Sequence, residues 1–143
     1  MIESNIHIRW ATTNDAQGLA KLNDEFNGVG ITEDEIIENL SSSNELVALA
    51  LINDLPVGFA CAQCYKSICY SNPCAEITEM YIKNDARRRG IATLLLAFIE
   101  EELEVRGVKS VKVLTGKKNG IAIKTYEKSS YIKKEEQVLQ KKL

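Results

Sequence analysis

The fold is decided by the run Ala75-Glu76-Ile77-Thr78-Glu79-Met80-Tyr81-Ile82 and by the run Arg87-Arg88-Arg89-Gly90-Ile91-Ala92-Thr93 that follows it. The first run is strand-like, and the second is a basic glycine turn that opens an amphipathic helix. A strand feeding such a turn gathers unpaired backbone N–H groups and the positive end of a helix dipole at one spot, where an anion can bind. We therefore predict a phosphate-binding turn. A solvated basic loop is the alternative, because Arg-x-x-Gly-x-Ala alone is weakly specific.

Length and composition limit what the chain can be. With 143 residues it can bury one core, so we expect a single domain over residues 1–143 with one site. The net charge of −2 argues against a general nucleic-acid or membrane-surface binder. No apolar run approaches the ~20 residues that span a bilayer, and Met1-Ile2-Glu3-Ser4 lacks the layout of a signal peptide. We therefore expect a cytoplasmic protein with no nucleic-acid or membrane partner.

Four cysteines, Cys61, Cys64, Cys69 and Cys74, fall within one short segment. A metal or disulfide cluster is one interpretation, but the odd separation of Cys61 and Cys64 places them on opposite faces of a strand. Small buried hydrophobic side chains are the better interpretation for a cytosolic chain, so no metal is expected. The lone histidine, His7, lies on an N-terminal strand and is expected to be structural.

Local patterns predict an alternation of strands and helices along the chain. The predicted strands cover residues 6–10, 46–52, 55–65, 75–82, 110–114 and 131–139, and the predicted helices cover residues 16–26, 33–40, 91–106 and 120–128. Asp15 and Thr32 are the expected N-caps of the first two helices, and Asn53-Asp54 is the expected hairpin turn. The order β-α-α-β-β-β-α-β-α-β indicates an α/β (α+β) fold, a mixed sheet with helices on both faces.

Two separated motifs in this order of elements resemble the GNAT family, the Gcn5-related N-acetyltransferases, over nearly the whole chain. Glu79-Met80-Tyr81-Ile82, followed by the glycine turn, is similar to the central strand of that family and its pyrophosphate loop, Gln/Arg-x-x-Gly-x-Gly/Ala. Asn119-Gly120-Ile121-Ala122-Ile123-Lys124-Thr125-Tyr126-Glu127-Lys128 is similar to the family segment Asn-x-x-Ala-x-x-x-Tyr-Glu-Lys. One predicted helix and one predicted strand separate the two motifs, as the resemblance requires.

The resemblance implies a sheet that splays open between its fourth and fifth strands and holds acetyl-CoA as cosubstrate, with no metal. Backbone N–H groups of the glycine turn would hold the pyrophosphate, and backbone groups of the central strand would pair with the amide arm. The implied cofactor-binding residues are Met80, Tyr81, Ile82, Arg87, Arg88, Arg89, Gly90, Ile91, Ala92, Thr93, Asn119, Ala122 and Tyr126.

The chain departs from the family pattern at two places. The family often continues Tyr-Glu-Lys with x-Gly-Phe, where this chain has Ser129-Ser130-Tyr131, and it often has proline where Asn84 stands. Neither change removes a group that the reaction needs. Ser130 in place of glycine is expected to alter the turn that leads into the last strand.

Two glutamates are candidates for the base that removes a proton from an acceptor amine, whose pKa is near ~10.4. Glu76 and Glu79 are three residues apart, so on a regular strand only one faces the cleft unless a bulge intervenes. Glu76 matches the position of the base in the histone-acetylating members and ranks slightly ahead of Glu79. Either could act through a water, or could instead be a surface carboxylate paired with the lysine of a neighbouring strand.

Tyr126 is the candidate acid that protonates the leaving thiolate. Its alternative role is core packing, because Ala122 and Tyr126 share a helix face. A backbone N–H near Met80 to Ile82 is expected to stabilise the developing oxyanion. Cys64 or Cys69 could act as a nucleophile in a ping-pong scheme, but neither has a nearby histidine, so direct transfer in a ternary complex is simpler.

The acceptor is expected to enter beside the two early helices, which carry Asp24, Glu25, Glu33, Asp34, Glu35 and Glu38. This acidic rim favours a small cationic amine such as an aminoglycoside or a polyamine, although a solvated helix face would have the same composition. A protein or peptide N-acetyltransferase and a CoA-binding regulatory module without turnover are the alternatives. An ATP-binding protein ranks last, because a Walker lysine-threonine pair is missing. A homodimer is compatible with the sequence.

Overall fold

The structure, a computed structural model, describes residues 5–143, so the signal-peptide expectation that rests on Met1 to Ser4 lies outside the described residues. Its strands are β1 (Ile6–Trp10), β2 (Leu46–Ile52), β3 (Leu55–Tyr65), β4 (Cys74–Ile82) and β5 (Val111–Val113). Its α-helices are α1 (Ala16–Asn27), α2 (Glu33–Ser42), α3 (Ile91–Val105) and α4 (Gly120–Lys128), and two short 3-10 turns lie at Thr13–Asp15 and Asn84–Ala86. Within the described range, no helix combines the length and the apolar character that crossing a membrane requires.

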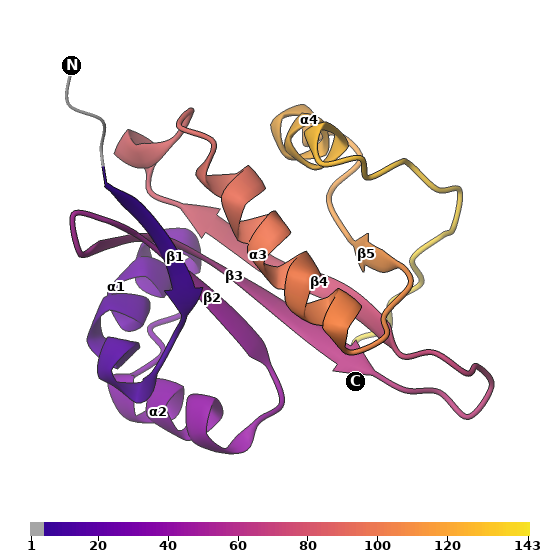
Figure 1. Cartoon of the computed structure of the whole chain (residues 1–143), viewed down its shortest axis with the longest axis horizontal. Helices are drawn as coiled ribbons and strands as arrows, with labels where there is room; N and C mark the ends of the chain where they lie inside the picture. Colours follow the sequence, from indigo (N-terminus) through magenta and orange to yellow (C-terminus); the bar gives the residue numbers. More distant parts are fainter. Residues whose placement is uncertain (1–4) are drawn as a thin grey trace.

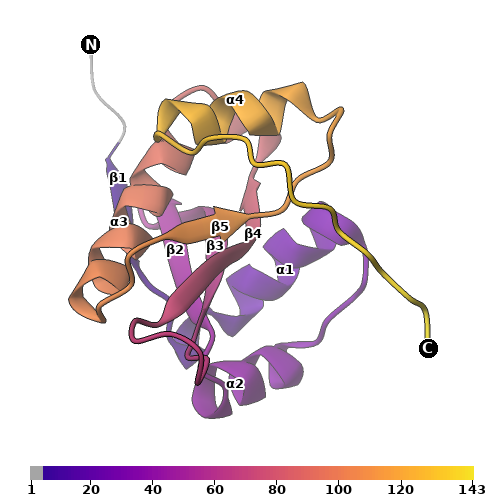
Figure 2. The ribbon, with the colours of Figure 1, turned by 90° about the vertical axis from the view of Figure 1, so that its right-hand side faces the viewer.

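The strands form one sheet in the order β1-β2-β3-β4-β5 (Figure 1). The pairs β1–β2, β2–β3 and β3–β4 are antiparallel, whereas β5 runs parallel to β4. Helices α1 and α2 cover one face of the sheet, whereas α3 lies across the other face with α4 beside it (Figures 1 and 2). The predicted fold, a mixed sheet with helices on both faces, is confirmed.

Short-range signals place the hairpin and the start of α2 where the sequence predicts them. Asn53 and Asp54 adopt left-handed φ values of 51° and 66°, which is the conformation that a two-residue hairpin turn requires. The Oγ1 atom of Thr32 accepts a hydrogen bond from the backbone N–H of Glu35, so Thr32 caps α2.

Asp15 stands at the N-cap position of α1, but its carboxylate makes other bonds. Its two oxygens accept hydrogen bonds from the guanidinium of Arg9 at 2.7 and 2.8 Å, and one of them also accepts from the backbone N–H of Thr12. The hydrogen bonds from Arg9 hold the pKa of Asp15 below its ordinary value. Asp15 therefore ties β1 to the start of α1 instead of capping the helix.

The side chains of the central strands differ in size between the two faces of the sheet. Ala48, Ala50, Ala60 and Ala62 face α3 and are fully buried. Their small side chains let α3 lie close to the sheet, where it buries Leu95, Leu96, Ile99 and Leu103. The opposite face carries larger side chains that pack under α1 and α2, namely Val47, Leu49, Leu51, Phe59 and Cys61.

The predicted last strand, residues 131–139, is wrong. After α4 the chain has no regular secondary structure and runs past β5 without joining the sheet (Figure 2). Ser130 takes a φ of 71°, the left-handed region that favours glycine, so the serine keeps the backbone conformation that a glycine would adopt at this turn. The segment also offers no continuous apolar face, because four charged residues, 133–136, stand between its exposed apolar ends Ile132 and Leu139.

We expect two neighbouring leucines of α3 to contribute very differently to the free energy of unfolding. Leu95→Ala should lower the free energy of unfolding by about 2–5 kcal/mol, because Leu95 is fully buried and its loss leaves a cavity. The matched control is Leu94→Ala, which should cost less than about 1 kcal/mol because Leu94 is 44% exposed. Urea unfolding of both variants measures the difference, and equal losses would contradict the packing of α3 described above.

Candidate functional site

A bulge in β4 turns both candidate bases toward the same face of the sheet. Ile77 lies opposite Ala62 and Glu79 lies opposite the adjacent Cys61, so Thr78 is an extra residue in β4. The extra residue reverses the alternation of side chains beyond it. Glu76 and Glu79, which would face opposite sides of a regular strand, therefore both lie on the face covered by α1 and α2.

The two glutamates have different surroundings on that face. Glu76 lies 3.7 Å from the Nζ atom of Lys112, its neighbour in β5. This is the surface ion pair that the sequence leaves open for either residue. Glu79 instead lines a cavity between the sheet and the early helices.

We call this cavity the α1–α2 cavity; its volume is about 200 Å³. Its apolar walls include Leu19, Ile31, Ile36, Leu40, Val47 and Phe59, and its polar lining consists of Asn23, Glu35, Asn39, Glu45 and Glu79. Burial, and then the charge of Glu45, raise the pKa of Glu79 above the ordinary value for a glutamate. Glu79 therefore holds a proton more readily than an isolated surface glutamate would.

The sheet opens directly beside Glu79. The β4–β5 ladder contains only the pairs Ala75–Val111, Glu76–Lys112 and Ile77–Val113. Beyond Ile77, β4 continues to Ile82 beside β3, while no strand among residues 5–143 pairs with its other edge. Backbone groups on that edge of β4 can therefore bond to an extended ligand.

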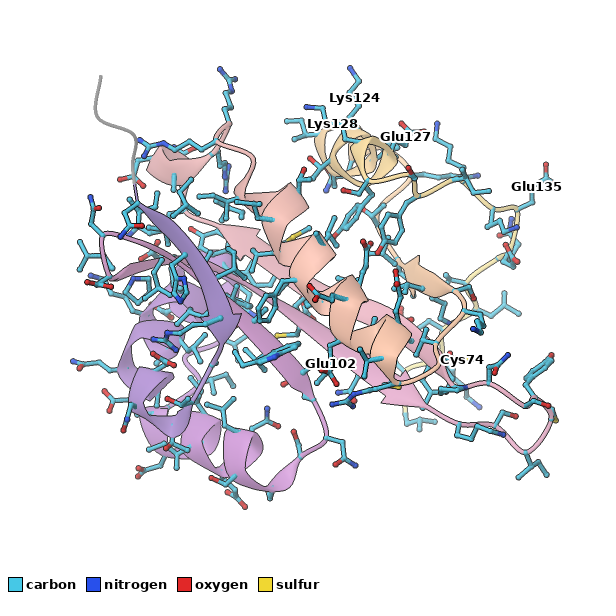
Figure 3. The ribbon with its side chains drawn as sticks, in the orientation of Figure 1. Cys74, Glu102, Lys124, Glu127, Lys128 and Glu135 are labelled. Atoms are coloured by element: carbon cyan, nitrogen blue, oxygen red, sulfur yellow. The ribbon has the colours of Figure 1, made fainter. Side chains whose placement is uncertain are left out.

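Tyr126 comes to this opening from α4. Its ring packs against Tyr131, with ring centroids 5.7 Å apart, and against the core on the α3 side, so its alternative packing role is also met. Burial, and then the charge of Glu79, raise the pKa of Tyr126. The hydroxyl thus lies within electrostatic reach of Glu79, which comes from a different element. Figure 3 shows Lys124, Glu127 and Lys128 projecting from α4 toward solvent.

The glycine turn has the geometry of an anion site. Residues 87–93, which we call the anion turn, place Arg88 at a φ of 65° and Gly90 at a φ of 76°. The first α-helical bond of α3 runs from the N–H of Leu94 to the carbonyl of Gly90 at 3.1 Å, and Gly90 has no side chain to cap the helix. The N–H groups of residues 91–93 are consequently left without an intrahelical acceptor at the positive end of the helix.

The three arginines of the anion turn are not equivalent. The Nε atom of Arg87 donates to the carbonyl of Ile82 at 3.0 Å, and its guanidinium lies 6.0 Å from the ring centroid of Tyr81. Arg87 is thus held against the end of β4. Arg88 and Arg89 are exposed beside the helix start, where their charge adds to the positive potential.

Asn119 stands at the N-terminus of α4, and Met80, Tyr81 and Ile82 form the end of β4. The Oδ1 atom of Asn119 accepts from the N–H of Ala122 at 3.2 Å and caps α4, so the predicted bond to a cofactor arm would come from its Nδ2 group. Met80 and Ile82 pack on the α3 side, whereas the ring of Tyr81 packs against Phe26, with centroids 5.5 Å apart. The alternating side chains anchor this end of β4 on both faces.

The acidic rim expected from the sequence contributes little to the α1–α2 cavity. Of the six acidic residues named for it, only Glu35 lines the cavity. Glu25 instead accepts a hydrogen bond from the hydroxyl of Tyr81 at 3.3 Å and lies 3.5 Å from the Nζ atom of Lys83.

Sequence reasoning missed Glu45, which precedes β2 and lines the cavity. The Nδ2 atom of Asn39 donates to its Oε1 atom at 2.7 Å. A glutamate directly before an apolar strand was the available signal, but nothing local places it beside Glu79.

The cysteines do not form a cluster. All four thiols are free, and Cys61 and Cys64 lie on opposite faces of β3. Burial raises the pKa of Cys61 well above its ordinary value, so its thiol stays protonated. Across residues 5–143, no three or more histidine, cysteine, aspartate or glutamate side chains are arranged to hold a metal ion.

Comparison with known proteins places this chain in a family. The model of the acetyltransferase (GNAT) family matches residues 10–131. An uncharacterized N-acetyltransferase of Methanocaldococcus jannaschii is 34% identical over 85 residues, which cover 59% of this chain and 38% of that protein. The match therefore spans well under half of the length of that relative.

Two solved structures share the fold. The aminoglycoside N-acetyltransferase AAC(6')-Iy, in complex with CoA, has a TM-score of 0.84 at 20% identity, over 99% of this chain and 97% of that chain. An aminoglycoside acetyltransferase from an uncultured soil metagenomic sample, in complex with sisomicin, has a TM-score of 0.80 at 20% identity, over 96% and 95% of the two chains. At this identity the likeness concerns the fold alone. Since the family match covers most of the chain, from the end of β1 through the anion turn to the end of α4, the chain belongs to the acetyltransferase (GNAT) family.

Proposed function

We propose that this protein is an acetyl-CoA-dependent N-acetyltransferase that acetylates a primary amine of a small cationic acceptor by direct attack. One observation carries the proposal. Glu79 of β4 and Tyr126 of α4 come within electrostatic reach of each other where the sheet opens, and a cavity adjoins Glu79. The family match and the CoA complex of a protein with the same fold support acetyl-CoA as the donor.

The residues present fit a coenzyme A molecule. The N–H groups at the start of α3, which lack an intrahelical acceptor, suit a diphosphate, and the positive charge of Arg88 and Arg89 adds to their attraction. The free edge of β4 beyond Ile77 suits an extended arm with amide groups, and the Nδ2 group of Asn119 can add a donor. When bound there, acetyl-CoA supplies the acetyl group as a thioester.

Glu79 is our candidate for the base, ahead of Glu76. An alkylamine with a pKa near ~10.4 must lose a proton before it can attack. Glu79 lines the cavity and its pKa is raised, so it accepts a proton more readily than an ordinary carboxylate. Glu76 is held by Lys112 instead.

Tyr126 is our candidate for the acid. As the acceptor nitrogen bonds to the carbonyl carbon and the carbon–sulfur bond breaks, the sulfur would take a proton from the hydroxyl of Tyr126, and the second proton lost by the attacking nitrogen would restore that hydroxyl. A backbone N–H near Met80, on the open edge of β4, can donate to the carbonyl oxygen as its charge grows.

The direct test incubates the purified protein with acetyl-CoA and a panel of primary amines and measures release of the CoA thiol. Amine-dependent release, with mass spectrometry showing one acetyl group on the amine, is the expected result. Tight binding of acetyl-CoA without release for any amine would favour a regulatory module and would reject the proposal.

Glu79→Gln should lower kcat by about 10²–10⁴, the usual contribution of a general base. In the unchanged protein the rate should fall as pH drops through the pKa of Glu79, because the base must be ionised, and this fall should occur above the ordinary glutamate pKa. The variant should lose this acid limb. Glu76→Gln is the matched control. A pH–rate profile altered by Glu76→Gln but not by Glu79→Gln would assign the role of base to Glu76 instead.

Tyr126→Phe should lower kcat by about 10²–10⁴ and leave the Kd for CoA nearly unchanged. Tyr131→Phe is the control, because its ring touches Tyr126 while its hydroxyl donates to Glu100 at 2.7 Å. That control should lose stability by roughly 1 kcal/mol and keep its turnover. Full turnover in Tyr126→Phe would remove this tyrosine from the mechanism.

Gly90→Ala should weaken CoA binding and lower stability by roughly 1 kcal/mol, because alanine resists the left-handed φ of 76° at this position. Gly120→Ala is the matched control, since Gly120 opens α4 without a left-handed φ and has nothing within 4 Å of its added Cβ. Isothermal titration with CoA and urea unfolding measure the two effects. Unchanged CoA affinity in Gly90→Ala would argue against the anion turn as the diphosphate site.

A further inference from the structure

The lining of the α1–α2 cavity indicates which kind of acceptor would fit it, which membership of the family does not. Its walls are mainly apolar, from α1, α2 and the sheet, and Leu19, Val47 and Phe59 are each at least nine-tenths buried. Its volume of about 200 Å³ lies below the roughly 300–1,000 Å³ of sites for drug-sized ligands. The space therefore suits a short hydrocarbon segment rather than a large polar molecule.

A second carboxylate enters this cavity beside Glu79. Glu45 is partly buried, and its Oε1 atom is fixed by the 2.7 Å hydrogen bond from Asn39 on α2. Its charge acts on both Glu79 and the buried thiol of Cys61, so it faces the interior of the cavity. The lining, which lies wholly within the described part of the chain, includes no lysine, arginine or histidine to offset this charge.

On the basis of the proposed function, we propose that the acceptor is a short linear diamine. One of its nitrogens contacts Glu79, and the other is held as an ammonium ion by Glu45. The alkyl spacer between them lies on the apolar walls of the cavity. Glu45 is then a specificity-determining residue. Glu35, in the first turn of α2, adds negative potential at the same cavity.

The chemistry of the lining disfavours other small amines. A monoamine would leave the charge of Glu45 without a counter-charge in a largely apolar space, which is unfavourable. An amino sugar would place several hydroxyl groups against the apolar walls, where few partners could satisfy them. A linear diamine satisfies both carboxylates and buries only methylene groups.

The experiment compares linear diamines of increasing length with monoamines of the same length. We expect kcat/KM for the best diamine to exceed that of its matched monoamine by about 10-fold or more, the usual effect of a charge-assisted hydrogen bond. Because a monoacetylated diamine has lost its second ammonium group, the enzyme should add one acetyl group and then slow sharply. These two measurements on the unchanged protein need no variant to fold.

Substitutions of Glu45 test whether this residue causes the preference for diamines over monoamines. Glu45→Gln keeps the shape of the side chain but should remove the diamine preference, by raising KM for the diamine and by lowering KM for the monoamine, which no longer leaves a carboxylate without a counter-charge. Glu45→Asp should keep part of the preference. Glu38→Gln, an exposed change on α2 away from the cavity lining, is the matched control.

The pH dependence of the rate distinguishes an electrostatic role of Glu45 from a purely structural one. Glu45→Gln removes a negative charge near Glu79, so the acid limb of the rate should shift to lower pH. Equal kcat/KM for diamine and monoamine, or better use of an amino sugar or a lysine peptide than of any diamine, would overturn this inference and leave the proposed function standing. Acetylation of no amine at all would reject the proposed function itself.

Discussion

The early end of the β4–β5 ladder is the constraint on which the rest of the structure depends. A parallel pair stabilises both strands only while their backbone groups face each other, and here three residue pairs meet that condition. Beyond them, the free edge of β4 must find other partners. The same strand is held firmly by β3 along its opposite edge, so the opening has one rigid wall. An extended ligand can bond to that wall without any rearrangement of the sheet.

The bulge at Thr78 completes this arrangement. Without it, Glu76 and Glu79 would project from opposite faces, and the side chains of β4 beyond it would exchange the cores into which they pack. With it, Tyr81 faces α1 and Met80 faces α3, as the two separate cores require. A single inserted residue thus sets both the packing of the strand end and the position of the candidate base.

Much of the fold was predictable because its signals are local. The hairpin at Asn53-Asp54, the Thr32 cap and the basic glycine turn each depend on a few adjacent residues, and the structure has all three. The last strand was predicted wrongly, because strand formation needs a partner, and the three-residue β5 offers a short one to a charged segment. The candidate site was only partly predictable. Glu79 and Tyr126 were named from motifs, whereas Glu45 joins them through tertiary packing that no short pattern encodes.

The four alanines under α3 affect the position of the anion turn. Because Ala48, Ala50, Ala60 and Ala62 carry only methyl groups, they let α3 lie close to the two central strands. The anion turn leads directly into α3, so the distance of its N–H groups from the sheet follows that of the helix. A bulkier residue at any of these positions would push the helix away from the sheet and move the turn with it, which would change the distance between the proposed diphosphate site and β4. The distance that the proposed cofactor must span between that turn and β4 would therefore depend on the smallest side chains in the core.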